Sequence, residues 1–398
     1  MDFGRASDLV EPFHLEIAIG ICMRTYDAIW QKQATFDQNL AALIVLTCGT
    51  GLVILFSASW FIGERLMGNG YYFFTRQLVW ALVGGVGAWV VSRLEGDWWR
   101  RAVPALLVVT IVLMLLPLLP VIGRPLMGAR RWIILGPITF QPSELLKLTM
   151  ILYVANFYSR RQDSLDNPKE TFIPPMIVVL VLSGLCLFQN DFSAAVFSFV
   201  LGLSMMFAAG LRLRFLLPTV VIGVPIGIFF LFARSYRVER LMTYFNPYEE
   251  PSGAGYQILS ARKALANGGL FGVGPGAGVR KLGSVPEIQA DFIAAVIGEE
   301  FGLVGIVAVF IIFGLLAFKS FQLVFQLKKP FESLVAAGIG TSITFQFLIN
   351  MGVVSGALPA TGVPLPFFSS GGSSLFINLV MMGILLSLSR GVDATKRL

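Results

Sequence analysis

Long, predominantly apolar stretches recur along the chain and are separated by polar links. Each approaches the roughly 20 residues that a helix needs to span a bilayer core. There are ten such stretches, at residues 40–60, 77–92, 102–122, 144–158, 172–188, 192–210, 215–233, 291–318, 331–356 and 372–389. The pattern therefore predicts an all-α polytopic membrane protein with ten transmembrane helices and both termini on one side.

Positive charge is distributed unevenly over the links between these spans. If the N-terminus lies inside, the inside segments carry 17 Lys and Arg, whereas the short outside loops carry five. The positive-inside rule then predicts cytoplasmic termini and a large extracytoplasmic loop, 234–290, between helices 7 and 8. We expect a cytoplasmic N-terminal segment, one membrane domain and a cytoplasmic tail, at residues 1–39, 40–391 and 392–398.

The composition supports a membrane protein and narrows the chemistry. Of the 398 residues, 56% are hydrophobic and 13% are charged, against about 25% charged in soluble domains. Cytoplasmic loops account for the net charge of +7, so we expect no nucleic-acid partner. The only histidine, His14, precedes the first span, and the three cysteines form no metal-ligand pattern. Acid–base chemistry therefore requires carboxylates, lysine or tyrosine, and no metal site is predicted.

Two opposite charges stand at the outer end of the fourth stretch. Glu144 and Lys147 follow Pro142 at a spacing of three residues, so on a helix they share a face and can pair. A charge in mid-membrane costs about 2.5–3.5 kcal/mol on insertion scales, so we expect both to face the bundle interior or a wet cavity. A self-contained ion pair at the helix start is the structural alternative.

The loop before that helix carries two adjacent arginines. Arg130 and Arg131 precede Trp132, and guanidinium groups fit phosphate while an indole favours the membrane interface. The pattern indicates a site for an anionic headgroup, with a simple interfacial anchor as the alternative.

A second, glycine-rich loop ends at a carboxylate. Gly272, Gly274, Gly276 and Gly278 favour a tight turn over a nucleotide fingerprint, because no predicted strand precedes them. Asp291, where the next apolar run begins, is the carboxylate best placed to act as a base. The alternative is an ordinary helix N-terminal acid. The same apolar run holds two deeper acids, and a further candidate separates spans five and six; these are Glu299, Glu300 and Asp191.

The segment 356–374 combines three prolines with small residues and predicts a re-entrant, non-helical turn buried in protein. Together with QPSELLK at 141–147, GGLFGVGPG at 268–276, DFIAAVIGEEFGLVG at 291–305 and LPFFSSGGSSL at 365–375, it resembles the SEDS family of FtsW, RodA and SpoVE. The sequence is more similar to the FtsW branch than to RodA. The resemblance implies a peptidoglycan glycosyltransferase that polymerises lipid II at the outer face of the cytoplasmic membrane, with undecaprenyl diphosphate as leaving group.

The resemblance also implies roles for individual residues. Asp291 matches the family's catalytic aspartate, and Glu144 and Lys147 match the charged pair of its QPSE helix. Arg130 and Arg131 are candidates for holding the diphosphate, since positive charge stabilises a developing anion. The remaining expected substrate-binding residues are Glu299, Glu300, Gln289, Lys281, Ser369 and Ser373.

This chain departs from the family pattern at two places. Gln289 and Ala290 stand where the family usually has His-Thr, and Ser370 replaces a tyrosine. Gln289 can supply only a neutral hydrogen bond, which leaves the pH profile of the activity open.

The resemblance further implies partners and a location. We expect a class B penicillin-binding protein, other divisome or elongasome membrane proteins, and a place in the bacterial inner membrane at the division septum. No cofactor is required by the pattern, and assistance by a divalent cation, Mg²⁺ or Mn²⁺, stays open. The alternative functions are a lipid II flippase and a division scaffold that recruits the penicillin-binding protein.

Overall fold

The computed structural model describes residues 36–119, 129–136, 138–165, 167–248, 254–278 and 289–392, and most of these residues are helical. Eight helical segments of this part are long and apolar enough to cross a membrane. They are α2 (Gln38–Met67), α3 (Tyr72–Val91), α4 (Gly96–Leu115) with the 3-10 turn η1 (Leu116–Leu118), α6 (Pro168–Thr171) joined to α7 (Ile173–Phe188), α9 (Leu213–Phe232), α12 (Ile293–Gln326), α13 (Pro330–Ser355) and α14 (Gly372–Ser389). The chain is a multi-pass membrane protein.

Two further helices coincide with predicted apolar stretches. α5 (Pro142–Ser159) contains Glu144 and Lys147 in its first two turns, and α8 (Phe192–Ala208) has 17 residues. A second 3-10 turn, η2 (Gln162–Ser164), follows α5. Most of the predicted cytoplasmic N-terminal segment, the tail after residue 392 and Lys281 lie outside the described residues.

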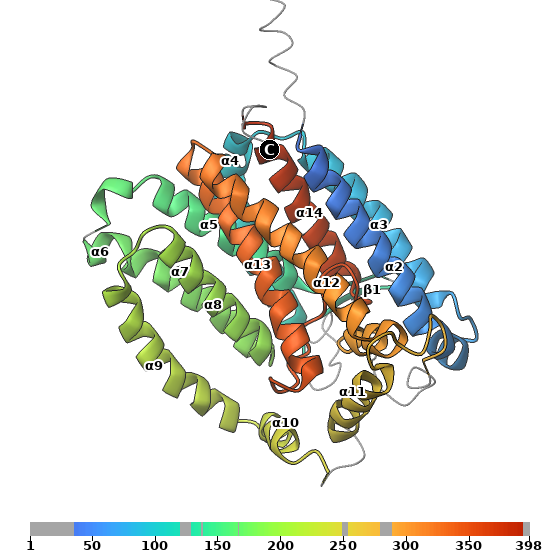
Figure 1. Cartoon of the computed structure of the whole chain (residues 1–398). Coiled ribbons are helices and arrows are strands. Elements are labelled where there is room, and N and C mark those ends of the chain that lie inside the picture. The colour runs from blue at the N-terminus through green and yellow to red at the C-terminus, as the bar shows by residue number, and fades with distance from the viewer. Residues whose placement is uncertain are drawn as a thin grey trace, which may run out of the picture.

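Helices α5, α13 and α14 occupy the middle of the bundle, whereas α9 lies at its edge (Figure 1). The most apolar window of α14 is 83% buried and that of α9 only 6%. Small residues allow the central helices to pack closely. A Cβ at Gly383 of α14 would lie 2.5 Å from the carbonyl oxygen of Ala88 in α3, so these helices meet backbone to backbone.

The two ends of the described chain meet at one end of the bundle. The backbone N–H of Asp37, before α2, donates to Ser389 Oγ at the end of α14, at 2.9 Å. Lys319 of α12 lies 3.7 Å from the Asp37 carboxylate. The first and last long helices therefore begin and end on the same side, as an even number of spans requires.

Shorter elements gather at the opposite end of the bundle. A hairpin of β1 (Ile133–Leu135) and β2 (Ile138–Phe140) leads directly into α5, with Ile133 paired to Phe140. The helices α10 (Ser235–Phe245) and α11 (Ala254–Gly268) lie between α9 and α12 in sequence. The segment before α5 and the predicted loop 234–290 thus contain secondary structure of their own.

The glycine-rich loop after α11 packs on a kink in α12. Gly302 has a φ of +64°, and the carbonyl oxygens of Glu299 and Glu300 accept hydrogen bonds from the amides of Val273 and Gly274. A Cβ at Gly272 would lie 2.1 Å from the Glu300 carbonyl oxygen. These glycines therefore permit a close turn against a helix, in agreement with the prediction of a turn.

Candidate active site

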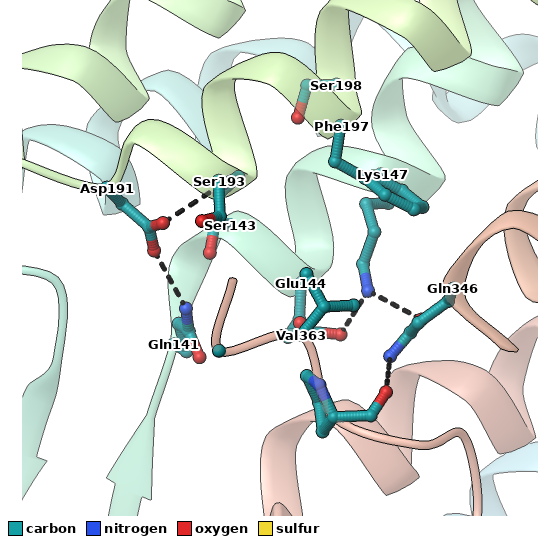
Figure 2. Close-up of a pocket in the computed structure, with 13 residues that line it drawn as sticks. Gln141, Ser143, Glu144, Lys147, Asp191, Ser193, Phe197, Ser198, Gln346 and Val363 are labelled. Carbon is teal, nitrogen blue, oxygen red and sulfur yellow. Dashed lines mark hydrogen bonds and ion pairs between the residues drawn. The ribbon is translucent and has the colours of Figure 1, made fainter. Parts of the chain in front are cut away.

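The start of α5 holds the buried charge pair. Pro142 fixes the first helical position, and Lys147 Nζ lies 2.6 Å from Glu144 Oε2. Despite this distance, Glu144 Oε2 is not aligned as a hydrogen-bond acceptor. Lys147 also donates to Gln346 Oε1 of α13 at 3.1 Å (Figure 2). The predicted pairing and the predicted interior location are both confirmed.

This pair lines a narrow polar cavity of about 40 Å³, which we name cavity A. Figure 2 shows α5, α8, α13 and the loop after α13 converging on it. The side chains and backbone that line it belong to Gln141, Ser143, Glu144, Lys147, Asp191, Ser193, Ala194, Phe197, Ser198, Gln346, Gly362, Val363 and Pro364.

Two amides of α13 hold the non-helical loop 356–371 in place. Gln346 Nε2 donates to the carbonyl of Pro364 at 3.1 Å, and Asn350 Nδ2 donates to the carbonyls of Val363 and Asp291, each at 2.9 Å. The sequence interpretation missed both amides. A signal was present, because Ser342, Gln346 and Asn350 repeat every four residues and so share one helix face.

Asp291 lies beside the same loop. Its side chain is partly exposed, and a Cβ built on Gly362 would lie 3.5 Å from Asp291 Oδ2. Gly362 is itself part of the cavity A wall. The carboxylate therefore faces the backbone that closes this cavity.

Asp191 connects three elements at the mouth of cavity A. Its Oδ1 accepts the amide of Ala194 at 3.0 Å and so caps α8. Its Oδ2 lies 3.3 Å from Gln141 Nε2 and 3.4 Å from Arg131 Nη1. Asp191, which separates the predicted spans five and six, is thus buried and links the segment before the hairpin, the start of α5 and α8.

A second cavity of about 130 Å³, which we name cavity B, also has Asp191 in its wall. Arg131 contributes to its wall, whereas the adjacent Arg130 is exposed and lines neither cavity. The wall comprises Ala129, Arg131, Asn190, Asp191, Phe192, Ser193, Leu231, Tyr236, Arg237, Arg240, Leu241, Pro359, Ala360 and Thr361. The sequence interpretation missed the α10 arginines, because only the fold brings α10 to this hairpin.

Ser369, Ser373 and Gln289, which the sequence analysis predicted to bind substrate, make hydrogen bonds within and next to the loop 356–371. Ser369 Oγ accepts the amide of Leu365 at 2.9 Å, and Ser373 Oγ lies 3.3 Å from the amide of Gln141. The carbonyl of Gln289 accepts the amide of Ser370 at 2.8 Å, which ties the loop to the segment before Asp291.

Glu299 and Glu300 lie in the walls of neither cavity. Asn267 Nδ2 donates to Glu299 at 3.2 Å, and Ser57 Oγ donates to Glu300 at 2.8 Å. These contacts join α12 to α11 and α2. Within the described ranges, no group of three His, Cys, Asp or Glu side chains could hold a metal ion.

The profile of the FtsW/RodA/SpoVE family of cell cycle proteins matches residues 37–393. The chain belongs to this family. It is 38% identical over 361 residues to a Trichlorobacter lovleyi protein named probable peptidoglycan glycosyltransferase FtsW, covering 91% of this chain and 95% of that protein. A Coxiella burnetii protein of the same name is 37% identical, with 90% of this chain and 98% of that protein covered.

Solved structures of the family share this fold. A chain of a peptidoglycan synthase complex, described for its structural coordination of polymerization and crosslinking, matches with a TM-score of 0.74 at 27% identity, over 90% of this chain and 99% of that one. The rod shape determining protein RodA of Thermus thermophilus matches with a TM-score of 0.65 at 27% identity, over 89% and 97%. The family predicted from the motifs is therefore confirmed.

Proposed function

We propose that this chain is a peptidoglycan glycosyltransferase that polymerises lipid II at the outer face of the bacterial cytoplasmic membrane during cell division. Its membership of the family and its similarity to proteins named FtsW support this activity. The observation that carries the proposal is the position of Asp291 beside the loop that forms walls of both cavities.

The proposal includes a topology of ten spans. α5 and α8 complete the eight apolar segments, and α8 with 17 residues meets the lower limit for a spanning helix. α5 carries two charges, but their mutual pairing and burial remove them from lipid. The uneven Lys and Arg distribution then places both termini in the cytoplasm and the two cavities outside.

Asp291 acts as the general base in this mechanism. The acceptor hydroxyl of lipid II loses its proton to the Asp291 carboxylate while its oxygen attacks the anomeric carbon of the growing chain. A new C–O bond forms, the bond from the anomeric carbon to the diphosphate oxygen breaks, and undecaprenyl diphosphate leaves with the electron pair. Arg131 stabilises the negative charge that develops on this leaving group.

Glu144 and Lys147 position the reacting groups beside this base. Lys147 fixes Gln346, which in turn holds the loop through Pro364, so the wall facing Asp291 is set by the charge pair. A rigid wall favours catalysis because misplacement of a reacting group by about 1 Å can cost roughly a hundredfold in rate.

The test measures glycan chains made from labelled lipid II by the purified chain with its class B penicillin-binding protein, in the presence of a divalent cation. We expect ladders with the wild type and none with Asp291→Asn. Asp97→Asn is the matched control, because Asp97 is 57% exposed in its side chain and lies at the opposite end of the bundle. Ladders that persist with Asp291→Asn would remove Asp291 from the mechanism, and none from a folded wild-type complex would favour the scaffold or flippase.

A further inference from the structure

We propose that cavity B binds the diphosphate of a polyprenyl-linked substrate, and that Arg237 and Arg240 of α10 are phosphate ligands together with Arg131. The proposal rests on the proposed function and deepens it by naming the cavity and two further residues that bind the diphosphate. Asp291 and the loop after α13 then face the sugar portion, and cavity B receives the anionic link to the lipid.

Among the described residues of its wall, cavity B has more arginines than carboxylates. Three arginines line it, and Asp191 is the one carboxylate among the residues of its wall. Asp191 reaches Arg131 at 3.4 Å and is shared with Gln141 and the N-terminus of α8. An excess of guanidinium groups around one cavity favours an anion, and their planar fork matches phosphate oxygens.

Two buried polar atoms of this wall lack hydrogen-bond partners among the described residues. They are Arg131 Nε and Thr361 Oγ1, which belong to the hairpin segment and to the loop after α13. Leaving a buried donor unsatisfied is unfavourable. Both groups can donate to a phosphate oxygen, and both belong to residues that line cavity B.

Arg237 is held in a fixed position. Its Nη1 donates to the carbonyl of Phe230 at 2.7 Å, and its Nε donates to Tyr236 Oη at 3.0 Å. Tyr236 Oη donates to the carbonyl of Asn190 at 3.0 Å. These contacts engage two of the five N–H donors of the guanidinium and leave others for the cavity.

The backbone conformation of Asn190 also contributes to the wall of cavity B. It adopts a φ of +62°, a left-handed conformation that non-glycine residues adopt at a cost. The conformation turns the chain sharply between α7 and α8, and it presents the Asn190 carbonyl to Tyr236. The strained residue thus anchors the α10 arginine cluster against α8.

The position of cavity B suits a lipid-linked ligand. Leu231 at the end of α9 is part of its wall, and the neighbouring residue Phe232 is 60% exposed. α9 is the least buried of the candidate spans, so its apolar face contacts lipid. A polyprenyl tail can therefore stay beside α9 while the diphosphate enters the cavity. Asp191 and Ser193 line both cavities, so the next group along the ligand points towards cavity A.

The test measures binding, so that it is separate from polymerisation. Farnesyl diphosphate serves as a short probe for the full-length protein in nanodiscs of zwitterionic phosphatidylcholine, and calorimetry gives its Kd. We expect Arg240→Gln to weaken binding about tenfold and Arg240→Lys to weaken it less, since one charge-assisted hydrogen bond is lost or weakened. Arg234→Gln is the matched control, because Arg234 precedes α10, is exposed and does not line cavity B.

Several outcomes would overturn the assignment. One is a Kd unchanged by both Arg240→Gln and Arg131→Gln, and another is equal weakening by Arg234→Gln. Farnesyl monophosphate binding as tightly as the diphosphate, or displacement of the probe by phosphatidylglycerol, would identify a general phosphate or headgroup anchor instead. Asp291→Asn should bind the probe normally, so a failure of the catalytic proposal leaves this result intact.

Discussion

Cavities A and B share Asp191 and Ser193, yet the charged side chains of their walls are paired to different degrees. In cavity A the Lys147 ammonium is satisfied by Glu144 and Gln346 within the protein. In cavity B the arginines outnumber the carboxylates among the described residues of its wall, and Arg131 Nε has no protein acceptor among the described residues. The difference indicates that the charge pair of cavity A stabilises the fold around it. The arginines of cavity B are, by our proposal, there to bind an anionic ligand.

Breaking the pair of cavity A should have the largest effect. Lys147→Met leaves the Glu144 carboxylate buried without its cation, which costs about 3–5 kcal/mol of folding free energy. The double variant Glu144→Gln/Lys147→Met should recover most of the loss, because no charge is then left unpaired. Thermal unfolding in detergent compares the variants. Equal losses in both would show that the pair is not a self-contained unit.

Releasing the loop between the cavities should have the next largest effect. Asn350→Leu removes both hydrogen bonds to Asp291 and Val363, and we expect kcat to fall by about tenfold or more with little change in KM. Ser355→Ala, at the exposed end of the same helix, is the control. A rise in KM alone would indicate that Asn350 acts in binding and not in positioning Asp291.

Arg131→Gln should separate affinity from stability. The Arg131 side chain is 25% exposed, so loss of its ion pair with Asp191 should change the unfolding free energy by about 1 kcal/mol or less. We expect the KM for lipid II to rise several-fold at the same time. Arg130→Gln should change neither quantity, because that exposed side chain lines neither cavity. Equal effects of Arg131→Gln and Arg130→Gln on KM would instead indicate that the two arginines serve only as an interfacial anchor.

Thr361→Val should give the smallest effect and the most specific one. Replacing an unsatisfied buried hydroxyl by a methyl group of similar shape is nearly neutral or slightly stabilising. The same change removes a donor from cavity B, so affinity for a polyprenyl diphosphate should fall about two- to fivefold. The probe affinity would thus fall while the melting temperature stays the same or rises slightly. A parallel loss of both would show that the hydroxyl has a structural role.

The positions of the apolar stretches in the sequence predicted the long helices well. Each of the ten stretches coincides with a helix, because a backbone in lipid must satisfy its own hydrogen bonds and a helix does so locally. The pairing of Glu144 with Lys147 was also predictable, since a spacing of three residues places both side chains on one face.

The candidate site was only partly predictable. Arg130 and Arg131 are equivalent in sequence, but the hairpin directs only Arg131 into a cavity wall. Glu299 and Glu300 were expected to bind substrate, and they contact α11 and α2 outside the two cavities. The amide of Asn350 donates to the carbonyl of Asp291, and the guanidinium of Arg237 lines a cavity with Arg131. These residues are far apart in the sequence, so no local pattern indicates the contacts.

The sequence by itself determined that the chain resides in a membrane, which residues form its long apolar helices and which family motifs it carries. These properties depend on hydropathy and on short-range spacing, which a linear pattern contains. Only the tertiary structure decided that the loop after α13 lies against Asp291 and that α10 completes an arginine-lined cavity with the hairpin. Those contacts join segments more than 50 residues apart in sequence, and they form because helix packing brings the loops together at one end of the bundle.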